Sequence, residues 1–448
     1  MERSLFMDTD TIFALATPVG GPIAILRISG PRAKEALARV FTGKIQHRYM
    51  AYGALMEGER QIDSIMAVYF AAPATYTGED MAELYLHGGQ GVVRQALALL
   101  PGLGLRQAQA GEFTRRAFLN GKMDLSEAEA VQDLIAATAR RGAASAMEQL
   151  SGGLRRRIEA LESDLLDALS GIDAAIDYPE ELEEDVYSHL PGLLEGIKAQ
   201  LAALIQEGRE NRVLREGARV ALVGLPNAGK SSLLNALLGE EKAIVTPIAG
   251  TTRDVLEGSC ALDGVAIRLL DTAGIRDTAD TVEKIGVDRA LAAAAQADLV
   301  LICLDGAEAP GPDAALLFEK TEGMPRLCAL CKGDLGLDPG AKALPEGYGV
   351  NALSLSAKTG AGMEALREAI PRAVAPGAGE SALITNARHV EALENALAAL
   401  LAADPQSPDP DCLATDLRCA LDALGRITGR AIEESIVERI FSRFCVGK

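Results

Sequence analysis

The sequence contains no tryptophan, and aromatic residues make up only 4% of its 448 residues. So few rings argue against a broad base-stacking surface for single-stranded nucleic acid. Cysteine is also scarce, because seven residues is a small and odd number for this length, which disfavours a disulfide-dense secreted fold. No run of about 20 apolar residues occurs, and the N-terminal stretch has acids and no long apolar segment. We therefore expect neither a membrane span nor a signal peptide.

Positive charge is the minority sign, since 44 Lys and Arg residues stand against 63 Asp and Glu residues, a net charge of −19. Together with the few cysteines, this favours a reduced, soluble, cytoplasmic protein and argues against one that coats nucleic acid through its general charge. The acidic net charge is still compatible with local basic sites. Three basic groups are candidates for contact with an RNA partner, and ordinary helix-surface charge is the alternative for each. They are the arginine runs at 115–116 and 155–157 and, towards the chain end, Arg426, Arg430, Arg439, Arg443 and Lys448.

At about 150 residues per domain, the length predicts roughly three domains, and 48% hydrophobic residues suffice for several cores. Residues 1–122 show mixed α and β patterns. Residues 123–214 carry apolar side chains at helical spacing, residues 215–375 alternate strands and helices as in a mostly parallel sheet, and residues 376–448 return to helical spacing. The simplest interpretation is one helical domain interrupted by an inserted α/β domain.

Several elements follow from local patterns. Strand-type runs lie at 23–28 and 64–70, and the Asp-Gly pair between two apolar runs at 262–265 predicts a hairpin. A long helix is expected from Pro191 to Leu214. Further helices are expected near 385–403, 409–424 and 430–443.

A phosphate-binding motif, Gly224-Leu-Pro-Asn-Ala-Gly-Lys-Ser231, lies directly after an apolar strand and before a helical run. Its glycines let the backbone curl so that N–H groups face phosphates, Lys230 supplies positive charge, and the hydroxyl of Ser231 can ligate Mg²⁺. A chance glycine turn is a poor alternative, because strand, motif and helix occur together. The predicted nucleotide-binding residues here are Asn227, Ala228, Gly229, Lys230, Ser231 and Ser232.

Three downstream motifs favour guanine over adenine. An acid at Asp271 can hold the Mg²⁺ shell, and the Gly274 amide can sense the terminal phosphate. The carboxylate of Asp334 can accept two hydrogens from the guanine edge, and Ser356-Ala-Lys358 can support the base; solvated loop charges are the alternative for Lys332 and Asp334. The predicted binding residues are Asp271, Thr272, Ala273, Gly274, Lys332, Asp334, Ser356, Ala357 and Lys358. Their order matches a GTPase domain.

The position after Gly274 is Ile275, where many GTPases carry a glutamine that orients the attacking water. An isoleucine cannot orient water, so another residue must do so. Arg253, Asp277 and Glu283 are candidates, although on spacing alone each could be an ordinary surface charge.

The whole set of motifs resembles the MnmE (TrmE) family of tRNA-modification GTPases over essentially the full chain. The segments that carry the resemblance are ILRISG at 25–30, TGED at 77–80, HGG at 87–89, AGEFTRRAFLNGKMDL at 110–125, GLPNAGKSS at 224–232, AGTTRD at 249–254, DTAGIR at 271–276 and FCVGK at 444–448. Many families share the GTPase motifs, whereas the N-terminal set and the terminal Cys-x-Gly-Lys are specific.

The resemblance implies an α/β multidomain protein with an N-terminal α+β domain that binds folate and dimerises, a helical bundle domain and an inserted Ras-like P-loop GTPase domain. This agrees with the organisation predicted above. It also implies a homodimer that joins the flavoprotein MnmG in a heterotetramer-type complex. Together they would install a (carboxymethyl)aminomethyl group at C5 of the wobble uridine of certain tRNAs.

The resemblance further implies a folate site and a potassium site. Arg27, Glu79 and Lys122 would help to bind 5-formyl-tetrahydrofolate or a related one-carbon folate, with Lys448 contributing at the chain end. A folate has a glutamate tail suited to Arg or Lys and a pterin edge suited to a carboxylate. Without the resemblance, each would be interpreted as a surface ion-pair residue.

In this family K⁺ replaces an arginine finger when two GTPase domains meet. By position, the K⁺ ligands would be Asn227, Thr246, Ile248 and Thr251. Thr252 would join Ser231 on Mg²⁺, so that Thr246, Thr251 and Thr252 also belong to the expected GTP site. Glu283 falls at the position of the family's water-positioning carboxylate.

One position departs from the family, because Cys331 stands where an asparagine usually begins the guanine motif Asn-Lys-x-Asp. A thiol is a poor substitute for an amide that both donates and accepts. Losing such a bond costs about 1 kcal/mol, so we expect somewhat weaker GTP binding. Cys328 and Cys331 have the spacing of a redox or zinc pair, but no second pair or nearby histidine supports that. Two buried strand cysteines are therefore favoured.

Cys445 lies close to Lys448, whose ammonium can lower a thiol pKa. A small apolar residue on the last helix is the alternative. The match to the terminal motif favours a catalytic role whose chemistry the sequence leaves open.

Two other classes of function stay open. A GTPase switch that assembles ribosomal subunits makes no covalent change to RNA and usually adds an RNA-binding module, which we do not find in the sequence. A GTP-gated scaffold whose N-terminal domain only dimerises does not need Arg27, Glu79, Lys122 or Cys445.

Overall fold

The computed structural model describes residues 10–239, 257–271, 292–377, 379, 382–405 and 410–447, with backbone alone at 179–187, 257 and 271. The chain forms two compact units, one from Met1–Gln132 with Gly425–Lys448 and the other from Asp133–Leu424. The boundaries between the units fall inside two helices, α4 (Leu125–Ala136) and α14 (Pro410–Thr428).

The first unit is built on a six-stranded sheet with the strand order β3-β4-β5-β2-β1-β6. Neighbouring strands are antiparallel except β1 and β6, which are parallel. The strands are β1 Ile12–Leu15, β2 Ile23–Ser29, β3 Ala51–Glu57, β4 Arg60–Phe70, β5 Met81–His87 and β6 Arg106–Gln107. The strands predicted at 23–28 and 64–70 are thus confirmed.

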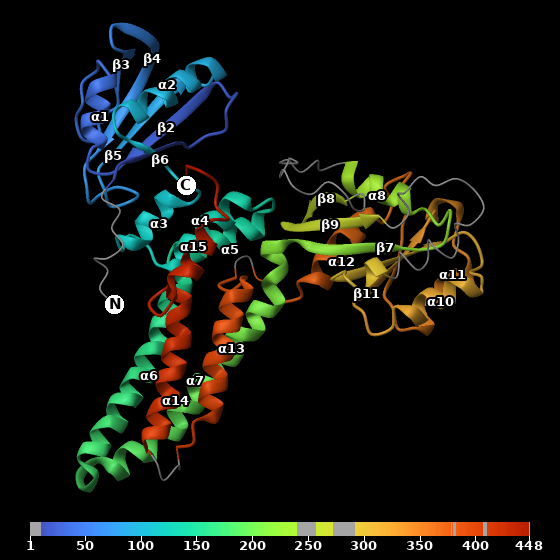
Figure 1. Ribbon diagram of the computed structural model, residues 1–448. Helices are drawn as coiled ribbons and strands as arrows, with labels where there is room; N and C mark the ends of the chain where they lie inside the picture. Colours follow the sequence, from blue (N-terminus) through green and yellow to red (C-terminus); the bar gives the residue numbers. More distant parts are fainter. Residues whose placement is uncertain are drawn as a thin grey trace. The chain divides into compact units, whose positions relative to one another are not determined.

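Alternation along β2 separates the two faces of this sheet. Ala24, Leu26 and Ile28 are buried in a core that α1 (Ala33–Val40) and α2 (Gln90–Gly102) share (Figure 1). Because successive strand side chains alternate, Arg27 lies on the other face, where it is half-buried.

The end of the chain packs in this unit against α3 (Glu112–Leu119), through Phe118 and Phe441, whose ring centroids are 6.3 Å apart. The last helix, α15, covers Glu434–Phe441 and is shorter than the predicted 430–443. Gly429 has φ 87 and ends α14 at Thr428, four residues beyond its predicted end, so the chain turns there before α15 begins.

The second unit contains another six-stranded sheet, in the order β12-β11-β10-β7-β9-β8, in which only β8 runs antiparallel to its neighbour. The strands are β7 Ala218–Val223, β8 Glu257–Leu262, β9 Val265–Asp271, β10 Leu299–Asp305, β11 Arg326–Cys331 and β12 Ala352–Ser354. The hairpin predicted at 262–265 is confirmed. Asp263 and Gly264 have φ 43 and φ 74, which is the two-residue turn that Asp-Gly favours.

Helices cover both faces of the second sheet. Leu222 of β7 packs with Leu233 and Leu366 on one face, and Val223 packs with Phe318 on the other. The helices of this region are α8 Lys230–Gly239, α10 Pro312–Lys320, α11 Pro339–Gly347 and α12 Met363–Val374. The predicted mostly parallel α/β sheet is confirmed.

Long helices from both sides of the inserted sheet lie side by side in this unit (Figure 1). They are α6 Gly153–Asp177, α7 Pro179–Glu216, α13 Ala387–Ala402 and α14, with the shorter α5 Arg140–Leu150 at one end. The expected start of the second helix at Pro191 was wrong. Pro179 occupies the first helical turn, where a missing N–H costs nothing, and Pro191 lies inside the helix.

Among the helices that the structure describes, none is long and apolar enough to cross a membrane.

Candidate nucleotide site and N-terminal cavity

The phosphate loop joins β7 to α8 at the carboxyl edge of the parallel strands. Two of its glycines admit no side chain. A Cβ on Gly224 would overlap the carbonyl oxygen of Cys303, and one on Gly229 would lie 3.0 Å from the Cβ of Cys331. Gly229 and Asn227 are both left-handed, with φ 96 and φ 62. A tightly curled loop followed by a helix N-terminus is the geometry that binds phosphate.

Lys230 already lies over this loop. Its Nζ donates to the carbonyl oxygens of Gly224 at 2.6 Å and Leu225 at 2.8 Å. Ser231 and Ser232 are exposed in the first turn of α8, whereas Ala228 is buried and anchors the loop. Ser231 is therefore accessible, as its predicted role as a Mg²⁺ ligand requires.

The other GTPase motifs follow strands on both sides of β7. Asp271 ends β9 and pairs in register with Leu222, two residues before Gly224. On the opposite side, β11 leads into Lys332 and β12 leads into Ser356. The structure thus places the phosphate loop between Asp271 and the guanine motifs along one edge of the sheet.

On the base side, the Nζ of Lys332 pairs with Asp305 Oδ2 at 2.6 Å, and the residue has φ 58. Asp334 is exposed, and its hydrogen bond with buried Ser356 lowers the pKa of its carboxyl below the usual value. An ionised Asp334 is the acceptor that the guanine edge requires. Lys358 is exposed nearby in sequence, after the same strand.

The interpretation of Cys328 and Cys331 as buried strand cysteines is confirmed. Both lie in β11 and are at most 3% exposed. Burial, with a smaller contribution from Cys331, raises the pKa of Cys328 to about 12, so its thiol stays neutral. Within the described ranges, no group of His, Cys, Asp and Glu side chains is suited to hold a metal ion.

Several predicted site residues lie outside the described residues, and their roles stay predictions. They are Thr246, Ile248, Thr251, Thr252, Thr272, Ala273, Gly274, Glu283 and Lys448, together with Arg253, Ile275 and Asp277.

In the first unit, Arg27 is held by a carboxylate and two rings. Its guanidinium pairs with Glu83 at 2.9 Å and lies 5.7 Å from the ring centroids of both Tyr76 and Phe113. Such cation–π contacts orient a guanidinium while leaving an edge open. The side chain is 17% exposed, so part of it reaches solvent.

Next to this arginine is a cavity of about 470 Å³. Its lining comes from β4, β5, the loop between them and the segment between α1 and β3: Arg48, Phe70, Ala74, Thr75, Tyr76, Met81 and Glu83. Glu83, which sequence reasoning missed, lies opposite Arg27 across β5 and β2 and also accepts from Tyr85 at 2.9 Å. Only strand pairing shows that Glu83 faces Arg27, because the two are 56 residues apart in the sequence.

Glu79 lies in a buried polar cluster. It accepts from Ser29 Oγ at 2.7 Å and from Arg116 at 3.2 Å. Arg116 is 3% exposed and also binds Asp10 and Glu112. The expectation that Arg116 contributes to an RNA-binding surface was therefore wrong, because acids of its own domain surround it.

The terminal motif lies beside β1. Cys445 is exposed and follows α15, and its carbonyl oxygen accepts from the Gly111 N–H at 3.3 Å. Gly447 has φ 98, and a Cβ there would overlap the carbonyl of Leu15 in β1. Since β1 pairs with β2, the chain end lies one strand away from Arg27. Lys122 is exposed and donates to the Pro73 carbonyl at 3.0 Å.

Comparisons with known proteins cover nearly the whole chain. A family model described as the GTP-binding protein TrmE N-terminus matches residues 11–122, and one described as the MnmE helical domain matches residues 125–445. The tRNA modification GTPase MnmE of Heliobacterium modesticaldum is 42% identical over 98% of this chain and 99% of its own. That of Listeria welshimeri is 42% identical over 99% of this chain and 100% of its own. Among solved structures, the G domain of the T. maritima FeoB iron transporter is 32% identical over 35% of this chain and 98% of its own, with a TM-score of 0.27.

Proposed function

The chain belongs to the MnmE family of tRNA modification GTPases, and we propose that its GTP hydrolysis serves the modification of a wobble uridine in tRNA. The flavoprotein MnmG would be its partner in forming the (carboxymethyl)aminomethyl group at C5. The observation that carries the GTPase part is the order of motifs along one sheet edge, with the phosphate loop between Asp271 and the Asp334–Ser356 pair.

The described residues support distinct roles in GTP binding. Asp334 would accept from the guanine edge, and Lys230 would pair with the terminal phosphates from its position over the loop. Ser231 and Thr252 would hold Mg²⁺, a hard cation that prefers oxygen ligands, and the exposed hydroxyl of Ser231 fits that demand. Bound Mg²⁺ would neutralise charge on the phosphates.

We assign K⁺ activation to Asn227, with Thr246, Ile248 and Thr251 as further ligands. The support is that Asn227 lies in the phosphate loop and is exposed, so a cation beside the phosphates could approach its side chain. Glu283 would position the attacking water, since Ile275 cannot. The expected result is turnover in KCl and none in NaCl, with Asn227→Ala losing the K⁺ stimulation while Mg²⁺-GTP affinity stays within about twofold. Equal wild-type turnover in both salts would sink this assignment.

The N-terminal cavity is the proposed folate site. It offers a carboxylate on Glu83 for the pterin edge, a guanidinium on Arg48 for the glutamate tail, and the ring of Tyr76 for stacking. Arg27 borders it through Glu83 and Tyr76. Lys122 and Lys448 stay proposals from the family pattern, and Glu79 would act through the buried cluster that it forms with Arg116 and Ser29.

The terminal thiol is proposed to act in the modification step, on the folate side. Cys445→Ser should leave GTP turnover unchanged, because Cys445 belongs to the first unit and the phosphate loop to the second. A serine hydroxyl stays protonated at neutral pH, so wobble-uridine modification should fall if a thiolate takes part. Full modification by the serine variant would refute a thiolate role for Cys445.

The deciding experiment is mass analysis of wobble uridines in tRNA from cells that lack this protein. Loss of the modified base, restored by the wild-type gene and not by Lys230→Ala, supports the proposal. Unchanged tRNA together with defective ribosomal subunits would favour the ribosome-assembly switch. Unchanged tRNA and normal ribosomes would favour the scaffold. We also propose a homodimer, a heterotetramer-type complex and a cytoplasmic location. Sedimentation measurements test the two assemblies, and localisation measurements test the compartment.

A further inference from the structure

Helix α5 carries an arginine that ties together three segments of the second unit. The Arg141 backbone N–H donates to the carbonyl of Gly264, in the β8–β9 turn, at 2.9 Å. Its guanidinium donates to the carbonyl of Gly379 at 2.9 and 3.2 Å, and it lies 4.0 Å from the carboxylate of Asp263. The side chain is only 11% exposed, whereas Asp263 is 66% exposed.

The turn and the helix fit each other closely. Ala139, the N-cap residue of α5, makes no side-chain cap bond, so the carbonyl of Gly264 supplies an acceptor to the first turn of the helix. A Cβ on Gly264 would lie 3.0 Å from the Cγ of Arg141. Both the backbone and the side chain of Arg141 therefore hold the hairpin.

The same helix also contacts the two places where the chain passes between the sheet and the long helices. A Cβ on Gly142 would lie 2.5 Å from the carbonyl of Leu214, near the end of α7. Ser145 donates to the carbonyl of Ala382 at 2.5 Å, and Gln149 donates to Thr385 at 3.1 Å, just before α13 begins. Thus α5 contacts both connections as well as the hairpin.

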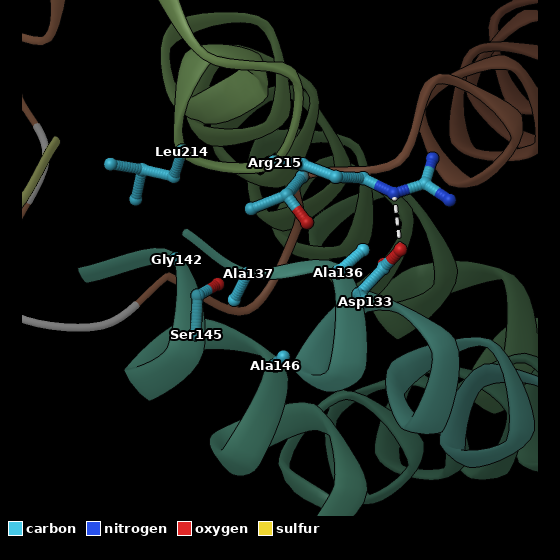
Figure 2. Close-up of a pocket in the computed structure, with 9 residues that line it drawn as sticks. Asp133, Ala136, Ala137, Gly142, Ser145, Ala146, Leu214 and Arg215 are labelled. Atoms are coloured by element: carbon cyan, nitrogen blue, oxygen red, sulfur yellow. Dashed lines mark hydrogen bonds and ion pairs between the residues drawn. The ribbon is translucent and has the colours of Figure 1, made fainter. Parts of the chain in front are cut away.

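A small cavity lies at this junction (Figure 2). Its volume of about 30 Å³ is room for one or two water molecules. Figure 2 shows Ser145 and Ala137 facing Leu214 across it, with the Asp133–Arg215 ion pair at its edge, where the side chains approach within 2.8 Å. The cavity lies where α5 meets the end of α7, beside the close contact between Gly142 and Leu214.

The hairpin continues directly into the phosphate-side segments. Strand β8 begins at Glu257, five residues after Thr252, and β9 ends at Asp271. Because β9 ends at Asp271 of the proposed GTP site, a shift of that strand between the GTP and GDP states would reach the β8–β9 turn, which Arg141 contacts. We propose that Arg141 is a positioning residue that couples the nucleotide state to the helices of this unit. For its consequence in tRNA, this inference rests on the proposed function.

The test uses the full-length chain and three variants. Arg141→Ala removes the guanidinium. Arg141→Lys keeps the positive charge on a single donor nitrogen but loses the planar, forked geometry of the guanidinium. Arg209→Ala is the matched control, because Arg209 also bridges two elements, to Glu394 of α13, yet makes none of the contacts with the hairpin turn. Each variant is measured for GTP turnover, for wobble-uridine modification in a complemented deletion strain, and for hydrogen exchange of residues 139–150 with GDP or a non-hydrolysable GTP analogue.

We expect Arg141→Ala to keep GTP turnover within about twofold while modification falls about tenfold, the size of a typical coupling between sites. The difference in α5 exchange between the two nucleotides should disappear, Arg141→Lys should restore part of it, and Arg209→Ala should match the wild type. If Arg141→Ala does not fold, Arg141→Lys carries the same comparison. An unchanged nucleotide dependence of α5 exchange in Arg141→Ala would overturn the coupling. Failure of the wild type itself to restore modification would refute the proposed function, while the exchange measurement would still decide the coupling.

Discussion

The phosphate loop and the N-terminal cavity beside Arg27 are built differently. The loop is eight consecutive residues, and backbone geometry shapes it through the tightly packed glycines Gly224 and Gly229. Around Arg27, beside the cavity, side chains from β2, β5 and α3 meet, and Arg27, Glu83 and Phe113 come from a stretch of 87 residues. A backbone site is sensitive to one added methyl group, whereas a side-chain site is sensitive to one lost charge.

The largest effect should follow from adding a side chain to the loop. In Gly224→Val, the Cβ overlaps the carbonyl of Cys303, and a backbone atom cannot move aside as a side chain would. Overpacking of this kind costs about 3 kcal/mol, which is roughly 150-fold in affinity. Isothermal titration should show GTP binding reduced at least to that extent.

The same variant should bind formyl-tetrahydrofolate normally, because the cavity and the loop belong to different compact units. Gly239→Ala, at the end of α8, is the matched control, because no atom of the described residues lies within 4 Å of a new Cβ there. Equal GTP affinity in Gly224→Val and wild type would show that the loop tolerates side chains there.

Removing one charge from the N-terminal cavity should weaken folate binding. Glu83→Gln leaves Arg27 without its carboxylate and also removes the proposed acceptor for the pterin edge. Hydrogen bonds to charged groups contribute about 2 kcal/mol, so folate affinity should fall roughly thirtyfold. Equilibrium dialysis with labelled folate measures this, and GTP turnover serves as the control.

Glu79→Gln tests whether Glu83 or Glu79 binds the pterin edge. Its carboxylate is bound by Arg116 and Ser29 and does not line the cavity. We expect a lower melting temperature from this variant and a smaller loss of folate affinity than from Glu83→Gln. The reverse order would assign the pterin edge to Glu79, as the sequence resemblance implies.

The same contrast explains what sequence could predict. The nucleotide motifs each lie within a few residues, directly after strands that apolar runs mark, so their placement along one sheet edge followed from the order of strands. Glu83 was missed because it meets Arg27 only through the antiparallel register of β2 and β5. Arg116 was misjudged because nothing near it in the sequence shows that Asp10 and Glu79 surround it.

Acid should weaken the first unit through its buried ion pairs. Burial of Glu112 disfavours its charge, but bonds from Arg106, the Gln109 N–H and Arg116 outweigh this and hold its pKa below the usual 4.5. The unfolded chain therefore binds the proton more readily. This contribution to stability is complete above about pH 4.5 and is lost as the pH falls through the lower, folded pKa.

Thermal unfolding between pH 6 and pH 3 measures this contribution, and Glu112→Gln is the control. The variant should be less stable near neutral pH and should lose less stability on acidification than the wild type, because its amide does not titrate. Parallel pH curves for the two proteins would assign acid lability to other carboxylates.

The smallest expected effect follows from replacing Cys331, which lies beside the phosphate loop and stands where the family usually has an asparagine. Cys331 is 3% exposed, and its Cβ lies 3.0 Å from where a Cβ of Gly229 would be, so an amide placed there would reach the phosphate loop. Cys331→Asn should gain a hydrogen bond of about 1 kcal/mol, tightening GTP binding roughly fivefold. The buried amide must be satisfied in the nucleotide-free protein as well, because an unpaired one would destabilise the fold. Titration with GTP and thermal unfolding without nucleotide separate these effects. Tighter GTP binding with an unchanged melting temperature would show that Cys331 lacks a contact to the phosphate loop that an asparagine makes. A lower melting temperature with no gain in affinity would mean that Cys331 is retained for packing against Gly229.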